Sequence, residues 1–211
     1  MRILIVAILS AMLMASNGWA AFIGSISEGD GLAFPEGSPW ADATLEWTVT
    51  HNGSSWVYEY TFSDHGKGNQ LRDVSHVIIE VSETFTLGNI MAGTTIDGEG
   101  PKTYTPSRSN PEMPNDIWGI KWDIDTDTTE YFWTIISDRM PMWGDFYAKG
   151  GGGTVAYNMM FGTDTSAAIG NGNAGGWVLV PDTTTVPIPS TAYLLGFGVV
   201  GLMLGRRRKK S

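Results

Sequence analysis

Alternating aspartates are the first residues whose spacing suggests chemistry. Asp123, Asp125 and Asp127 resemble the start of a calcium-binding loop, because carboxylate oxygens are ligands that Ca²⁺ prefers. Such a loop needs glycine at its sixth position and a bidentate acid at its twelfth, where this chain has Thr128 and Thr134. Aspartates that bond their own backbone in a hairpin turn explain the same spacing. We therefore expect a turn, with no bound metal, and keep the calcium site as the alternative.

Tryptophans are the second group with chemical potential, because an exposed indole can hold a sugar ring. Five of them lie in the apolar alternation that predicts a core, namely Trp47, Trp56, Trp118, Trp122 and Trp133. Trp40 follows Pro39, and Trp143 lies between Pro141 and Gly144, so both are expected in loops. Trp40 and Trp143 are the candidates for an exposed sugar-binding platform.

Catalytic patterns are missing from the sequence. There is no cysteine, no nucleophile elbow and no His-Glu-x-x-His motif. The three histidines, His51, His65 and His76, are scattered, and we expect them to bond in turns or to be exposed. The glycine-rich residues 170–175 match a dinucleotide fingerprint, but a predicted strand follows them where that motif needs a helix. The sequence predicts a noncatalytic chain without a cofactor.

The elements that would carry these residues are strands. Apolar and polar residues alternate over 45–50 and again over 56–62, and Asn52-Gly53 between them is a strong hairpin signal. Further strands are predicted at residues 75–82, 84–87, 117–124, 130–136, 145–148, 154–161 and 177–180. Residues 125–128 are expected to turn the chain between two of them, while residues 91–115 and 163–176 are expected to be loops. This pattern predicts an all-β domain, an antiparallel β-sandwich resembling a jelly roll.

The first 20 residues are typical of a signal peptide. Arg2 precedes an apolar run over 3–14, and Gly18-Trp19-Ala20 places small residues before a cleavage between Ala20 and Ala21. The run is too short for a membrane span of about 20 residues. We expect export through the inner membrane, with residues 1–20 removed.

The last 26 residues are typical of a membrane anchor. Val186, Pro187, Ile188 and Pro189 precede an uncharged apolar stretch over 191–205. A cluster of five cations then ends the stretch: Arg206, Arg207, Arg208, Lys209 and Lys210. Because positive residues resist translocation, we expect a single transmembrane helix with its basic end in the cytoplasm and residues 21–185 outside.

The negative charge of the exported part disfavours nucleic acid as a partner. All 22 acidic residues lie between Glu28 and Asp182, whereas six of the 13 basic residues lie in the two terminal segments. Residues 21–185 therefore carry 22 acidic and 7 basic side chains, a formal charge of −15. A field of this sign repels phosphates, so nucleic acid is not an expected partner.

The tail resembles the PEP-CTERM sorting signals of Gram-negative bacteria, which combine a short proline motif, an apolar helix and a basic end. Pro187 and Pro189 match the two prolines, and residues 206–208 match the basic end, while Ile188 stands where that motif has glutamate. The resemblance implies an exosortase, a membrane-embedded cysteine transpeptidase, as a partner that recognises the tail and often cuts near the motif. Residues 56–62, 75–80 and 143–149 are also similar to β-rich domains attached to such tails.

Together these features predict three parts: a signal peptide over 1–20, an acidic β-sandwich domain over 21–185 and a sorting and anchor segment over 186–211. The resemblance implies a noncatalytic surface or matrix protein in an exopolysaccharide or biofilm setting, anchored in the inner membrane or released from it. A carbohydrate-binding module is the alternative, and a carbohydrate-active enzyme is a weaker one.

Overall fold

The computed structural model describes residues 21–64, 71–94, 98–128 and 130–185. The described chain is built of strands with two short 3₁₀ turns, Leu87–Asn89 and Gly151–Gly153, which confirms the all-β prediction. Within these ranges no helix is long and apolar enough to cross a membrane. The predicted signal peptide and the predicted transmembrane tail lie outside the described residues.

Twelve strands make two sheets. In chain order they are β1 (Ala21–Glu28), β2 (Gly31–Ala33), β3 (Ala43–His51), β4 (Trp56–Asp64), β5 (Leu71–Glu80), β6 (Gly98–Tyr104), β7 (Ile117–Thr128), β8 (Glu130–Ser137), β9 (Arg139–Gly144), β10 (Phe146–Gly150), β11 (Val155–Asn158) and β12 (Val178–Thr185). Ten form one sheet in the order β6-β7-β5-β10-β11-β2-β1-β3-β4-β8, and β12 pairs with β9 in the other. All neighbours are antiparallel except β1 and β2.

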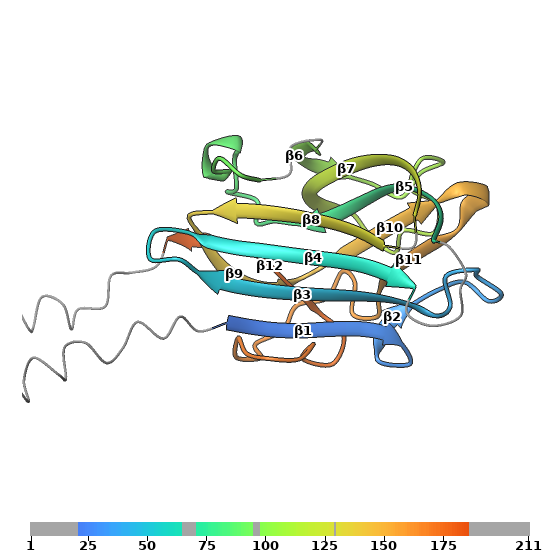
Figure 1. Cartoon of the computed structure of the whole chain (residues 1–211), viewed down its shortest axis with the longest axis horizontal. Helices are drawn as coiled ribbons and strands as arrows, with labels where there is room; N and C mark the ends of the chain where they lie inside the picture. Colours follow the sequence, from blue (N-terminus) through green and yellow to red (C-terminus); the bar gives the residue numbers. More distant parts are fainter. Residues whose placement is uncertain (1–20, 65–70, 95–97, 129, 186–211) are drawn as a thin grey trace, which may run out of the picture.

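The ten-stranded sheet curls so that its two halves face each other across one core (Figure 1). Phe62 of β4 lies 5.6 Å, between ring centroids, from Phe146 of β10, and Trp122 of β7 lies 6.2 Å from Trp133 of β8. The small sheet joins this core through β12, where Tyr60 donates a hydrogen bond to the Leu179 carbonyl. Because each large ring buries a large apolar area, these aromatic residues contribute strongly to the stability of the core.

The β3–β4 hairpin follows its sequence signal and is confirmed. His51 pairs with Trp56 at its end, and the Asn52 side chain accepts hydrogen bonds from the backbone N–H groups of Ser54 and Ser55. Gly53 has a φ of 95°, a conformation that glycine adopts without steric cost. The predicted core residues Trp47, Trp122 and Trp133 are all buried.

Three local predictions are wrong. Residues 125–128 do not turn the chain, because β7 continues through them and pairs Thr126 and Thr128 with β5. Residues 84–87 form no strand and lead into the first 3₁₀ turn. The predicted loop over 91–115 contains β6, which holds Pro101 because β6 is an edge strand with a register shift between Glu99 and Lys102.

Candidate functional site

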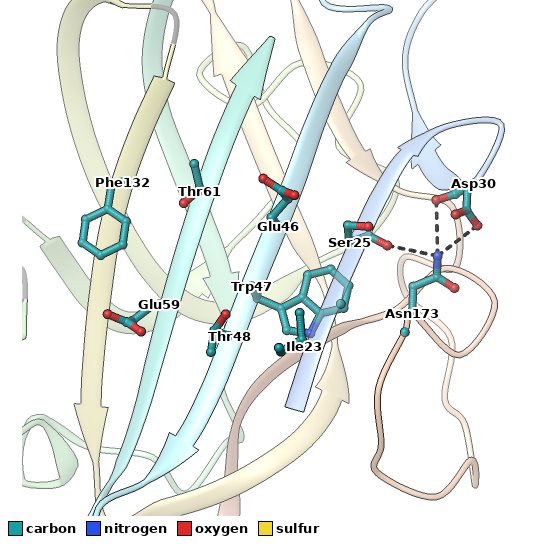
Figure 2. A pocket seen from close by; sticks show the side chains of 12 residues that line it. Ile23, Ser25, Asp30, Glu46, Trp47, Thr48, Glu59, Thr61, Phe132 and Asn173 are labelled. Atoms are coloured by element: carbon teal, nitrogen blue, oxygen red, sulfur yellow. Dashed lines mark hydrogen bonds between the residues drawn. The ribbon is translucent and has the colours of Figure 1, made fainter. Parts of the chain in front are cut away.

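The strongest candidate site is a groove on the outer surface of β1, β3, β4 and β8 (Figure 2). Two rows of outward-facing side chains cross these four strands. Residues that pair on neighbouring strands point to the same face, so their side chains lie side by side within each row. The first row is Ser25, Glu46, Thr61 and Phe132, and the second is Ile23, Thr48, Glu59 and Thr134. With strands about 4.8 Å apart, each row extends about 14 Å across the sheet.

A loop over residues 171–173 forms one wall of this groove beside β1. The Asn173 amide donates to the Ser25 carbonyl at 3.1 Å and to the Asp30 carboxylate at 3.0 Å (Figure 2). Ile23 donates its N–H to the Asn171 side chain and accepts a hydrogen bond from the Gly172 N–H. These bonds satisfy backbone groups on the edge of β1 and hold the loop in place.

The floor under β1 depends on a glycine. Trp47 of β3 pairs with Gly24 of β1, and its indole occupies the space that a side chain at Gly24 would need. A Cβ atom at Gly24 would overlap with the Gly172 carbonyl oxygen and with the Trp47 ring. Gly24 therefore lets the indole, β1 and the loop pack together.

The groove encloses about 710 Å³ and offers hydroxyls, an amide and three carboxylates, with exposed apolar groups on either side. Phe132 is 54% exposed and Ile23 is 59% exposed, while no lysine, arginine or histidine lines the groove in the described part of the chain. Such a surface suits a neutral or cationic ligand that stacks on an aromatic ring and exchanges hydrogen bonds with hydroxyls.

A second polar feature is a pair of carboxyl groups, Glu80 at the end of β5 and Asp145 between β9 and β10. Glu80 accepts a hydrogen bond from the Asp145 N–H at 2.7 Å. Burial, followed by repulsion from Asp145, raises the pKa of Glu80 to about 8. Its surroundings therefore favour the protonated form of Glu80. Burial also raises the pKa of Asp145.

Asp145 ties this region to the following segment of chain. Its carboxylate accepts hydrogen bonds from the Asn158 amide at 2.9 Å and from the Gly162 N–H at 2.7 Å. Asn158, fully buried, also donates to the Gly176 carbonyl and accepts from the Phe146 N–H. These contacts tie β5, β10 and β11 to one another and to the segments at Gly162 and Gly176, so we assign the network a structural role.

The predicted sugar platform is wrong for Trp40 and is not supported for Trp143. Trp40 is 1% exposed, because residues 35–42 fold back and pack its ring edge-on against Phe62 at 5.3 Å. Trp143 lies inside β9 rather than in a loop and is half-buried, with its Nε1–H donating to the Ala168 carbonyl. Among the described residues, the exposed aromatic ring is Phe132, which alternation alone places on the outer surface.

The remaining predicted site residues are the calcium candidates, the histidines and the terminal motifs. Asp123 forms an ion pair with Lys121, the side chains of Asp125 and Asp127 lie outside the described part, and no group of acids or histidines among the described residues could hold a metal. His76 is buried rather than exposed, because loop residues cover the outer surface of β5. The residues of the cleavage site before Ala21, of the sorting motif and of the basic end lie outside the described residues.

Comparison with known proteins adds no relative: no family model matches the chain, and neither a curated protein nor a solved structure is similar to it.

Proposed function

We propose that this chain is an exported, noncatalytic protein that displays its β domain at the cell surface or in an exopolysaccharide matrix. The tail would anchor it in the inner membrane until an exosortase-type enzyme processes it at Val186, Pro187, Ile188 and Pro189. The apolar run over 191–205 and the cations over 206–210 support the anchor.

The observation that carries this proposal is the position of the two ends of the described body. β1 (Ala21–Glu28) is the first strand of the described residues, and β12 (Val178–Thr185) is the last. Both ends lie at the same end of the long axis, and the two strands contact each other (Figure 1). An anchor attached there would leave the opposite end and the outer sheet surfaces free.

The finer fold class belongs to the same proposal. A curled sheet whose halves enclose one core is what an antiparallel β-sandwich requires, and this supports a jelly-roll-like fold. A domain of this kind needs no disulfide, in agreement with the absence of cysteine.

Intact mass of the mature protein from its native host tests the sorting proposal. We expect a chain that starts at Ala21 and ends near Pro189. The double variant Pro187→Ala, Pro189→Ala should keep residues 191–211, whereas Pro181→Ala, outside the motif, should be processed normally. A wild-type mass that includes residues 1–20 would contradict export, and one that includes 191–211 would contradict processing.

The groove of Figure 2 favours a second candidate, a carbohydrate-binding module. Phe132 supplies an exposed ring, and Glu59, Thr48, Thr61 and Asn173 supply groups that bond to sugar hydroxyls. Affinity electrophoresis in the host's own polysaccharide tests this candidate. Retardation that disappears in Phe132→Ala but persists in the control Leu87→Ala, another exposed apolar residue, would support it. Unchanged mobility of the wild-type protein would count against it.

A further inference from the structure

The centre of the groove in Figure 2 holds a regular arrangement of four outward-facing side chains. Glu46 of β3 pairs with Thr61 of β4. Two residues further along β3, Thr48 pairs with Glu59 of β4. The four side chains form a square, with the glutamates on one diagonal and the threonines on the other (Figure 2). Diagonal neighbours on adjacent strands are about 7–8 Å apart, so both carboxylates can reach one small ligand group over the square.

The charge of this square selects the sign of that ligand group. Glu46 and Glu59 are exposed, and the Glu59 carboxylate makes no hydrogen bond or ion pair within the part of the chain that the structure describes. Asp30 adds a third carboxylate at the wall beside β1, and no described lysine, arginine or histidine lines the groove. These carboxylates repel an anion, and a neutral group leaves their mutual repulsion in place, whereas a cation relieves it. The groove therefore favours a cationic group.

The acceptors around the square indicate which kind of cation fits. A primary ammonium carries three N–H donors and no acceptor. The two carboxylates and the Thr61 hydroxyl offer three acceptors to it. Phe132, the pairing partner of Thr61 on β8, presents a ring that is 54% exposed. The face of such a ring attracts a cation and also packs against the apolar side of a sugar ring.

The rest of the groove favours a saccharide over a basic peptide. The backbone groups of β3 and β4 bond to each other and to β1 and β8, so an extended peptide finds no strand edge on the floor. Ser25, Thr48 and Asn173 instead place small polar groups along the floor and the wall. Such groups exchange hydrogen bonds with the hydroxyls of a sugar, which the aliphatic chain of a lysine lacks.

We propose that the groove binds a saccharide with unsubstituted amino groups, a polymer of the glucosamine type. Its ammonium group donates to Glu46, Glu59 and Thr61, and the sugar ring beside it packs on Phe132. N-acetylation of the same sugar turns the ammonium into a neutral amide with a single N–H, which removes the charge and two of the three donors. This inference rests on the carbohydrate-binding candidate above and adds the charge of its ligand.

Calorimetric titration of the full-length chain in mild detergent at pH 6 tests the proposal, because amines are protonated and carboxylates ionised there. The probe is a glucosamine tetrasaccharide, and its comparisons are the N-acetylglucosamine tetrasaccharide, the glucose tetrasaccharide and tetralysine. We expect the probe to bind at least tenfold more tightly than each comparison. Glu46→Gln and Glu59→Gln should each weaken its binding about five- to tenfold, whereas Glu83→Gln, an exposed glutamate outside the groove, should not.

The outcomes separate this inference from the function on which it rests. Equal affinity for the three tetrasaccharides, lost in Phe132→Ala, would overturn the role of the amine and leave the carbohydrate-binding module in place. No binding of any saccharide would contradict both.

Two further results would overturn the inference. Tighter binding of tetralysine would point to a basic protein partner, and an equal loss of affinity in Glu83→Gln and Glu59→Gln would show attraction by the overall charge alone. Because Glu46 and Glu59 are exposed, their glutamine variants should keep the wild-type unfolding temperature, so that a loss of affinity reports on the groove. Full binding by both variants would also contradict the proposal.

Discussion

Among the described residues, the outer surface of β5, β7, β10 and β11 carries a second hydrophobic cluster, whereas the outer surface of β1, β3, β4 and β8 carries none. The cluster lies beneath loop residues, and its members are Ile78, Tyr104, Met113, Ile117, Tyr147, Val155 and Phe161. Tyr147 donates to the Pro111 carbonyl at 2.7 Å, which fastens one of these loops. On the other half, Glu46, Glu59 and Phe132 are exposed to solvent.

This difference shows which half of the sheet is available for binding. A sheet with a loop layer outside it is buried on both sides, so its strands are more continuously apolar, as in Val77-Ile78-Ile79. A sheet with one bare side alternates, as β3 and β4 do. The bare half is free to contact a partner, and the covered half stabilises the fold.

The largest expected effect compares two phenylalanines, one on each half. Phe161 is 8% exposed within the covered cluster, and Phe132 is 54% exposed on the bare surface. We expect Phe161→Ala to lower the free energy of unfolding by about 3 kcal/mol and Phe132→Ala to change it by less than about 0.5 kcal/mol. Chemical denaturation of both variants measures this, and equal losses would remove the distinction between the halves.

A pH effect of intermediate size separates Glu80 from Glu59. Because the folded-state pKa of Glu80 is raised from 4.5 to about 8, its stabilising contribution is complete below pH 4.5 and is lost as the pH rises through about 8. Relative to Glu80→Gln, the wild-type protein should lose about 2–3 kcal/mol of stability between pH 5 and pH 9.

Denaturation curves at several pH values measure this difference. Glu59→Gln, at an exposed position of β4, is the matched control and should follow the wild-type curve closely. A parallel pH profile for wild type and Glu80→Gln would mean that Glu80 is ionised in the folded chain.

A smaller effect is expected at the floor of the groove. Gly24→Ala forces its Cβ against the Trp47 indole and the Gly172 carbonyl, so it should cost about 1–2 kcal/mol and loosen the loop over 171–173. Gly170→Ala, with nothing within 4 Å of the new Cβ, is the control and should be neutral. Hydrogen exchange at the Gly172 N–H measures the loop, and unchanged protection in Gly24→Ala would show that the contact yields without cost.

The sequence predicts the regular part of the fold well and the exceptions poorly. Alternation around Asn52-Gly53 is enough for β3 and β4, because both strands pair locally. β6 could not be predicted from the sequence, because Pro101 and two glycines are unfavourable inside a strand. They are tolerated here because β6 lies at the edge of the sheet. The backbone at Thr126 is extended rather than turned because β5 offers it a pairing partner from elsewhere in the chain.

The candidate site was predictable only in its parts. The alternation places Glu46 and Glu59 on the polar side of their hairpin, but the groove also needs Phe132 and the loop at Asn173, which are far away in sequence. The burial of Trp40 could not be predicted either. Pro39 correctly predicts a turn, but no local sequence pattern indicates that the Trp40 ring packs against Phe62.

The most direct test of the proposed display is cysteine labelling in intact cells of the native host. The chain has no cysteine, so Thr61→Cys on the bare surface and Ala156→Cys in the core each introduce a single thiol. With a charged maleimide that passes the outer membrane but not the inner one, we expect Thr61→Cys to react in intact cells and Ala156→Cys to react only after denaturation. Labelling of Thr61→Cys only after lysis would place the domain in the cytoplasm and contradict the account.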